Sequence, residues 1–175
     1  MIFPFRREPA NRRRSAGRAL FESAVRQSRT PALYAAMGAP DTVEGRFELQ
    51  TLHVILLIER LRDEGAAAAA SSQALFDAYV GDLDGALREM GVGDLAVGKR
   101  MRELGNAFYG RATAYRKAFE ALPDRTSLEA LIGRTILADA AGVSPAGLAV
   151  YTLKCRDALL GAGDLLAGEP PWPAS

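Results

Sequence analysis

The chain has 175 residues, 49% of them hydrophobic and 25% charged, which favours a single globular domain with a substantial core. Its one cysteine excludes an internal disulfide, and no apolar run approaches the roughly 20 residues that span a bilayer. The net charge of +1 is unevenly spread, because residues 1–30 hold eight arginines and only two acidic residues.

The first fifteen residues are rich in arginine and lack the apolar stretch of a secretory signal. A basic segment on a mildly acidic body suits an anionic surface, either lipid headgroups or RNA, and the neighbouring phenylalanines favour lipid. We therefore expect a flexible basic tail over residues 1–15; the alternative is a solvated tail without a binding role. The candidates for contact with a membrane surface are Phe3, Phe5, Arg6, Arg7, Arg12, Arg13 and Arg14.

Apolar residues recur at helical spacing along most of the chain, whereas the alternation typical of strands is scarce. Short helices are predicted over residues 16–28 and 31–37. A long helix is predicted from Val43 to Glu64, with Asp41 or Thr42 as its cap, and its broad apolar face indicates a central position. The segment GAAAAASS at 65–72 predicts a loop or a weak helical turn before a helix over 72–90.

The clearest helical stripe starts at Val97 and continues at spacings of three and four to Leu122, where Pro123 ends it. A short helix around 126–138 and a last helix after Ser144 complete the chain, and residues 169–175 are expected to be a disordered tail. The sequence therefore predicts an all-α single domain over residues 16–168. We expect a bundle of six or seven helices with a long central helix pair.

The stretch GDLAVGKR at 93–100 resembles a phosphate-binding loop, but Arg100 stands where such loops have Ser or Thr. A phosphate-binding loop also follows a strand, whereas the residues before this stretch predict a helix. We interpret it as a helix junction, in which Gly91 and Gly93 end one helix and Asp94 caps the next. An exposed basic band follows, made of Lys99, Arg100 and Arg102.

Catalytic chemistry finds little support in the sequence. His53 is the only histidine, so zinc and di-iron sites lack their usual imidazole ligands, and no nucleophile motif accompanies it. A hydrogen-bonded core histidine is the favoured interpretation. Asp82 and Asp84 could serve acid–base chemistry, but two residues apart on a helix they point in different directions. We favour a partner-facing surface or internal ion pairs, and expect no metal, no cofactor and no enzyme.

Tyr109 and Arg111 lie off the stripe on which Phe108 and Tyr115 sit. An aromatic residue and an arginine pointing away from the core are typical of protein interfaces. The alternative is that Tyr109 packs on a neighbouring helix and Arg111 pairs with an acidic side chain.

Two segments carry a family resemblance. GAPDTVEGRFELQTLH at 38–53 and DLDGALREMGVGDLAVGKRMRELGNAFYGRATAY at 82–115 resemble the ubiquinol–cytochrome c chaperone family. The resemblance covers roughly residues 30–131, and its distinctive parts are GVGD-x-x-VGK-R and AFYGR-x-x-AY. We expect a bacterial member, because the sequence starts with a short arginine-rich segment and not with the long mitochondrial presequence.

The resemblance implies an assembly chaperone. Mitochondrial members bind newly made apocytochrome b near the ribosomal exit, together with a small partner protein, until haem insertion and assembly. For this chain it implies apocytochrome b as client, with a small partner protein or the ribosome left open. We expect no specific DNA, and from the basic tail we expect a cytoplasmic protein at the inner face of the cytoplasmic membrane. The implied client-contact candidates are Arg46, Glu48, His53, Asp82, Asp84, Arg88, Asp94, Lys99, Arg100, Tyr109 and Arg111.

The position of each motif residue relative to the apolar helical stripe separates structural residues from residues available to a client. Phe47, Phe108 and Tyr115 look structural, whereas Lys99, Arg100, Tyr109 and Arg111 look available to a client. Two other functions stay open. The arginine tail and the basic band would suit an RNA- or ribosome-binding module, and His53 with the two aspartates would suit a lipid- or quinone-linked enzyme.

Overall fold

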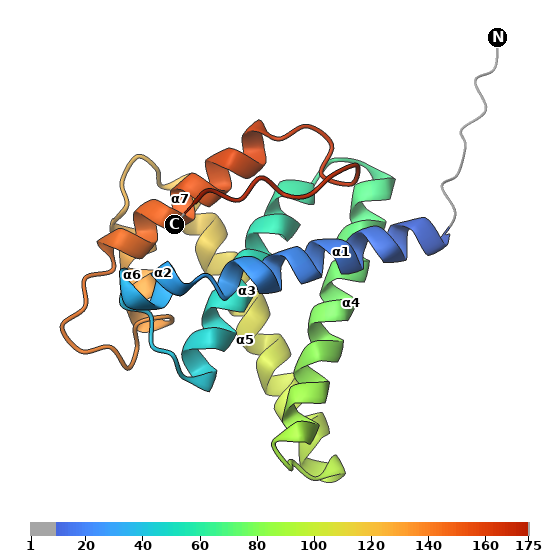
Figure 1. Cartoon of the computed structure of the whole chain (residues 1–175), viewed down its shortest axis with the longest axis horizontal. Helices are drawn as coiled ribbons and strands as arrows, with labels where there is room; N and C mark the ends of the chain where they lie inside the picture. Colours follow the sequence, from blue (N-terminus) through green and yellow to red (C-terminus); the bar gives the residue numbers. More distant parts are fainter. Residues whose placement is uncertain (1–9, 175) are drawn as a thin grey trace.

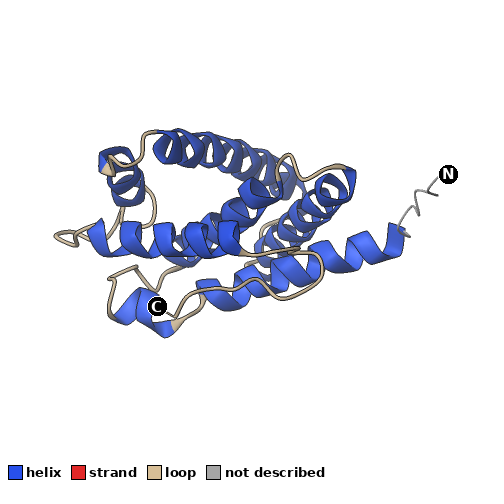
Figure 2. Ribbon diagram, turned by 90° about the horizontal axis from the view of Figure 1, so that it is seen from above, coloured by secondary structure: helices blue, strands red, loops and turns tan. Residues whose placement is uncertain are grey.

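A computed structural model describes residues 10–174, the first four of them by backbone alone. Within this part the chain forms seven helices and no strand, which confirms the predicted all-α fold (Figures 1 and 2). The helices are α1 (Ala10–Ser28), α2 (Pro31–Ala35), α3 (Val43–Leu61), α4 (Ala66–Glu89), α5 (Asp94–Glu120), α6 (Thr126–Arg134) and α7 (Ala146–Gly161).

Helix α3 occupies the centre of the molecule, as its broad apolar face predicts. Every residue from Thr51 to Leu57 is buried, and α1, α4, α5 and α7 all pack against this helix. At its start the Thr42 Oγ1 accepts a hydrogen bond from the Gly45 N–H at 3.1 Å, which confirms the predicted cap.

Helices α1 and α4 cross at Gly17 and diverge from there. A Cβ atom at Gly17 would lie 2.5 Å from Ala74 Cβ and 2.7 Å from both the Leu75 nitrogen and the Ser71 carbonyl oxygen. The absence of a side chain at Gly17 therefore allows the two helices to touch, and this contact fixes the position of α1 on the bundle.

Helices α4 and α5 are the longest, with 24 and 27 residues, and they form a hairpin whose turn projects beyond the rest of the molecule (Figure 1). Gly91 ends α4 with a φ of 79°, as predicted. Of the two alternatives for residues 65–72, the loop is wrong and the helical one agrees with the structure, because α4 already begins at Ala66. The predicted cap at Asp94 is also wrong, since Gly93 occupies the cap position and Asp94 is the first helical residue.

Both expected tails need correction. Helix α1 begins at Ala10, so residues 10–15 of the expected flexible tail are helical, and residues 1–9 lie outside the described part of the chain. The expected disorder at 169–175 is contradicted for residues 169–174. Trp172 Nε1 donates to Ser23 Oγ at 2.9 Å, Gln27 Nε2 donates to the Pro173 carbonyl at 3.3 Å, and Glu169 pairs with Arg26.

Candidate functional site

The predicted contact residues divide into buried and exposed groups. His53, on α3, has no exposed surface and is held from both sides of its ring. Its Nδ1 lies 2.7 Å from the Leu49 carbonyl, which can only accept, so Nδ1 carries the proton and Nε2 accepts from the Tyr151 hydroxyl at 2.8 Å. Burial lowers the pKa of His53 to about 4. The structure therefore contradicts His53 as a contact residue and confirms the core interpretation.

Glu48 and Arg111 form an ion pair between α3 and α5. Arg111 Nε donates to Glu48 Oε2 at 2.6 Å, its Nη2 donates to the other carboxylate oxygen, and the two side chains are only 25% and 10% exposed. The carboxylate beside it raises the pKa of Arg111. The pair links the hairpin to the central helix and confirms the alternative that Arg111 pairs with an acidic side chain. Client contact by Glu48 and Arg111 stays a prediction.

The other charged candidates lie on the surface. Asp82 accepts a hydrogen bond from Gln50 at 3.0 Å, and the remaining ones pair with residues close in sequence. These pairs are Arg46–Asp41, Arg88 with both Asp84 and Asp94, and Lys99 and Arg100 with Glu103. Exposed pairs of this kind contribute about 0–1 kcal/mol and can be exchanged for a partner's charges. Contact with a client stays a prediction for these residues.

Apolar side chains are exposed along the hairpin. Tyr109 is 61% exposed, and near the turn Met90 and Leu95 are 55% and 100% exposed. The ring of Tyr109 lies 5.8 Å from those of Phe76 and Phe108, so it packs on α4 and also faces outward. Sequence reasoning missed Met90 and Leu95 as surface residues, although both flank the glycine-rich turn.

A groove follows the seam between α4 and α5, and we call it the α4–α5 groove. It consists of two adjoining hollows of about 200 and 410 Å³, which share Phe76 and Phe108. The smaller one is apolar apart from Arg102, and the larger one extends past Tyr109 to the end of α3. The residues of the smaller hollow are Phe76, Tyr79, Val80, Leu83, Met101, Arg102, Leu104, Gly105 and Phe108.

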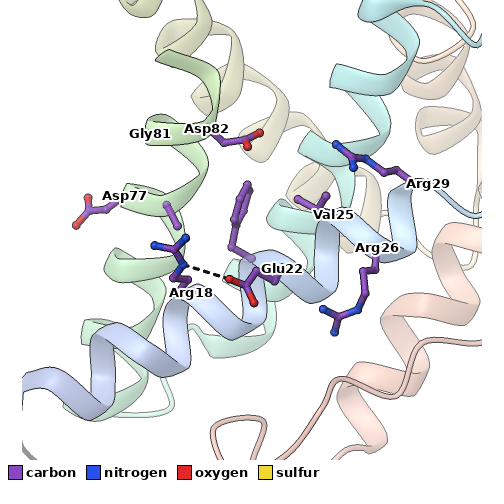
Figure 3. A pocket seen from close by; sticks show the side chains of 10 residues that line it. Arg18, Glu22, Val25, Arg26, Arg29, Asp77, Gly81 and Asp82 are labelled. Carbon is purple, nitrogen blue, oxygen red and sulfur yellow. Dashed lines mark hydrogen bonds and ion pairs between the residues drawn. The ribbon is translucent and has the colours of Figure 1, made fainter. Parts of the chain in front are cut away.

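A second depression lies where α1 and α4 diverge. It measures about 800 Å³, with Phe21 and Val25 among its lining residues (Figure 3). Arginines stand on the α1 side, where Arg18 pairs with Glu22 at 3.1 Å, and Asp77 and Asp82 stand on the α4 side. Sequence reasoning placed Asp82 among the candidates but gave no signal for the cleft, because it depends on the angle between two helices.

The described residues do not assemble the constellation considered for an enzyme. Asp82 faces Gln50 and Asp84 faces Arg88, while His53 is buried against Tyr151. Within residues 10–174 no three His, Cys, Asp or Glu side chains gather as metal ligands. Cys155 is buried, and burial raises its thiol pKa to about 12. No described helix combines the length and apolar character needed to cross a membrane.

The membrane-surface candidates fall mainly outside the described part. Phe3, Phe5, Arg6 and Arg7 lie before its first residue. Arg12, Arg13 and Arg14 belong to the first turns of α1, and the Arg14 side chain is exposed. Their contact with lipid stays a prediction.

Comparison with known proteins identifies the family. The family model for ubiquinol-cytochrome C chaperone matches residues 35–172. The chain is similar to the crystal structure of the Cbp3 homolog from Brucella abortus, with 35% sequence identity and a TM-score of 0.84, over 94% of this chain and 92% of that one. No curated protein sequence matches the chain. Because the family model covers well over half of its residues, the chain belongs to the ubiquinol–cytochrome c chaperone family.

Proposed function

We propose that this protein is an assembly chaperone for ubiquinol–cytochrome c reductase and that its client is newly made cytochrome b. The observation that carries the proposal is the family match over residues 35–172, together with a similar solved structure that covers nearly the whole chain. The chaperone role follows the family description. The choice of cytochrome b follows the resemblance of the two segments at 38–53 and 82–115 to mitochondrial members.

The surface supports this role physically. A membrane protein that has not yet been assembled exposes apolar helices, and a chaperone must cover them reversibly. The hairpin presents an apolar groove with exposed Tyr109 beside it and charged side chains around it. A largely apolar groove with a few polar groups at its margin is suited to such a client.

The arginine-rich start supports a location at the inner face of the membrane. Residues 1–30 carry a net charge of +6, and each basic residue near an anionic leaflet contributes about 1 kcal/mol. This attraction would hold the chaperone near its client without anchoring it. The RNA-binding alternative shares the arginine tail, but two members of its basic band, Lys99 and Arg100, share the single carboxylate of Glu103.

The proposal is tested by affinity-tagging the protein in its own host and solubilising membranes gently. We expect mass spectrometry to find cytochrome b enriched over the other subunits of the reductase, because a chaperone meets its client before assembly. A second tagged cytoplasmic protein of similar abundance serves as control. If ribosomal proteins or RNA co-purify and cytochrome b does not, the proposal is wrong.

A further inference from the structure

In the α4–α5 groove the smaller hollow is lined by α4 and α5 alone, and the end of α3 reaches only the larger hollow. Its seam residues Phe76, Val80, Leu83, Met101 and Leu104 are only partly buried, although a helical core would enclose them fully. Two packed helices leave an apolar furrow between them, and a third helix laid in that furrow completes the packing. The shape of this surface therefore suits a helical occupant.

The groove is long enough for several helical turns. Along α4 its lining extends from Ala69 in the larger hollow to Leu83 in the smaller one. At 1.5 Å per residue this distance is about 21 Å, which corresponds to about 14 residues of an opposing helix.

The charges of the groove are opposite at its two ends. Three charged side chains line it, and one of them, Arg62, is already paired with Glu59. The other two are Asp63, beside the end of α3, and Arg102, on the first turns of α5. Within residues 10–174 neither side chain forms an ion pair, although Asp63 contributes to raising the pKa of Arg116, whose ion-pair partner is Glu59. The groove therefore presents one anion and one cation, both outside ion pairs, to a helix that lies along it.

The floor of the groove leaves room for close approach. Gly105 lines the smaller hollow, and a Cβ atom added there would meet nothing within 4 Å. A glycine in the middle of a helix costs about 1 kcal/mol relative to alanine. This position therefore accepts a Cβ atom without a clash, and a side chain that extends from it into the smaller hollow would occupy the space of the ligand.

We propose that the α4–α5 groove binds one apolar helix of the client, about 14 residues long, with a basic residue at the Asp63 end and an acidic residue at the Arg102 end. The proposal rests on the chaperone function proposed above. The apolar seam supplies the affinity, and the two end charges fix which way the client helix lies.

A pair of glycine variants tests the location. Gly105→Leu fills the smaller hollow, whereas Gly110→Leu makes the same change on the same helix at a position that is also open but lines neither hollow. Both variants should unfold at or above the wild-type temperature, since leucine favours the helix. We expect Gly105→Leu to weaken client binding roughly ten-fold or more, and Gly110→Leu to leave it unchanged.

Synthetic peptides test the charges. The probe is a labelled 16-residue helix with one leucine-rich face, glutamine on the other face, Glu at one end and Lys at the other; the comparison peptides carry Lys, or Glu, at both ends. We expect the mixed-charge peptide to bind tightest by fluorescence anisotropy. Arg102→Glu should weaken it roughly five-fold, and Asp63→Asn by less. Lys117→Glu, an exposed change on α5 outside both hollows, should have no effect.

The outcomes separate this proposal from the proposed function. If cytochrome b co-purifies equally with wild-type protein and with both Gly105→Leu and Arg102→Glu, the chaperone function stands and the groove is not its site. Equal binding of all three peptides would also overturn the proposal. If the wild-type protein recovers no cytochrome b and binds none of the peptides, both proposals fail. If the wild-type protein recovers cytochrome b and the Gly105→Leu and Arg102→Glu variants recover less of it, the result supports both the chaperone function and the groove as its site.

Discussion

Among single residues, His53 illustrates what the sequence could and could not show. Its place on a broad apolar face predicts a core histidine, and the structure confirms this. The partners were not predictable, because Tyr151 and Trp172 come from distant parts of the chain. Tyr151 accepts from Gln27 at 2.9 Å and donates to His53, whose ring lies 5.2 Å from that of Trp172. The same limit applies to the ion pair of Glu48 and Arg111, because two residues 63 positions apart have no local signature in the sequence.

The depressed pKa of His53 predicts a pH-dependent stability. The unfolded chain has a histidine pKa of about 6.5, whereas the folded pKa is about 4, so acid protonates the unfolded state first. Stability is full above about pH 6.5 and falls as the pH drops towards 4, by about 2 kcal/mol between pH 7.5 and 5. Urea unfolding of wild type and His53→Gln at both pH values measures this. An equal loss in the variant would refute the assignment.

At the level of helices, the periodic stripes predict α3 and α5 well because buried helices repeat their apolar residues every three or four positions. The alanine run at 66–70 leaves a loop and a helical turn open because it has no stripe, and the structure shows the helix that the high helix propensity of alanine favours. The C-terminal segment has no periodicity at all, and tertiary contacts determine its conformation. The α4–α5 groove could not be predicted either, since it depends on how α4 and α5 pack together and on where α3 ends beside them.

The crossing of α1 and α4 predicts opposite effects for two glycines. Gly17→Ala places a Cβ against the backbone of α4 and should destabilise the protein by about 1–3 kcal/mol. Gly110→Ala meets nothing and should stabilise it by up to about 1 kcal/mol. Thermal unfolding measures both effects: the unfolding temperature should fall below that of the wild type for Gly17→Ala and rise above it for Gly110→Ala. A neutral Gly17→Ala would show that the crossing is looser than the structure has it.

The packing of the C-terminal segment can be followed by the fluorescence of Trp172. Trp172 is the only tryptophan, and it packs against His53 and donates to Ser23. Trp172→Phe removes the hydrogen bond but keeps an aromatic ring, so we expect the free energy of unfolding to fall by about 1 kcal/mol. Trp172→Ala removes both, so we expect it to fall by about 3 kcal/mol. In the wild-type protein the emission should shift to longer wavelength as the segment leaves the bundle. A red-shifted spectrum in the native state would contradict its packing.

For the whole molecule, the fold class and family were predictable from periodicity and from two distinctive segments, and the match over residues 35–172 agrees with them. The charge asymmetry was also visible in the sequence. Its role has to be tested with the complete chain, because residues 1–9 lie outside the described part. A deletion of residues 1–18 would not test membrane binding by the arginine-rich start alone. It would also remove part of α1, because residues 10–18 belong to that helix and Gly17 contacts α4.

The arginine-rich start predicts binding to anionic membranes. Replacing Arg6, Arg7, Arg12, Arg13 and Arg14 with glutamine removes five charges, each contributing about 1 kcal/mol near such a surface. We expect co-sedimentation with phosphatidylserine-containing vesicles to fall sharply and to be salt-dependent in the wild type. Neutral vesicles serve as the control. Sedimentation that does not change with the substitutions would leave the tail without this role.

The most direct test of cytochrome b binding at the α4–α5 groove is a photocrosslink formed in growing cells. We compare a photoreactive amino acid at position 109, beside the α4–α5 groove, with one at position 150 on α7. Val150 is 38% exposed, and α7 packs against α3 and α6. We expect an adduct with newly made cytochrome b at position 109 and none at 150. Adducts only at 150, or adducts at 109 that never contain cytochrome b, would contradict it.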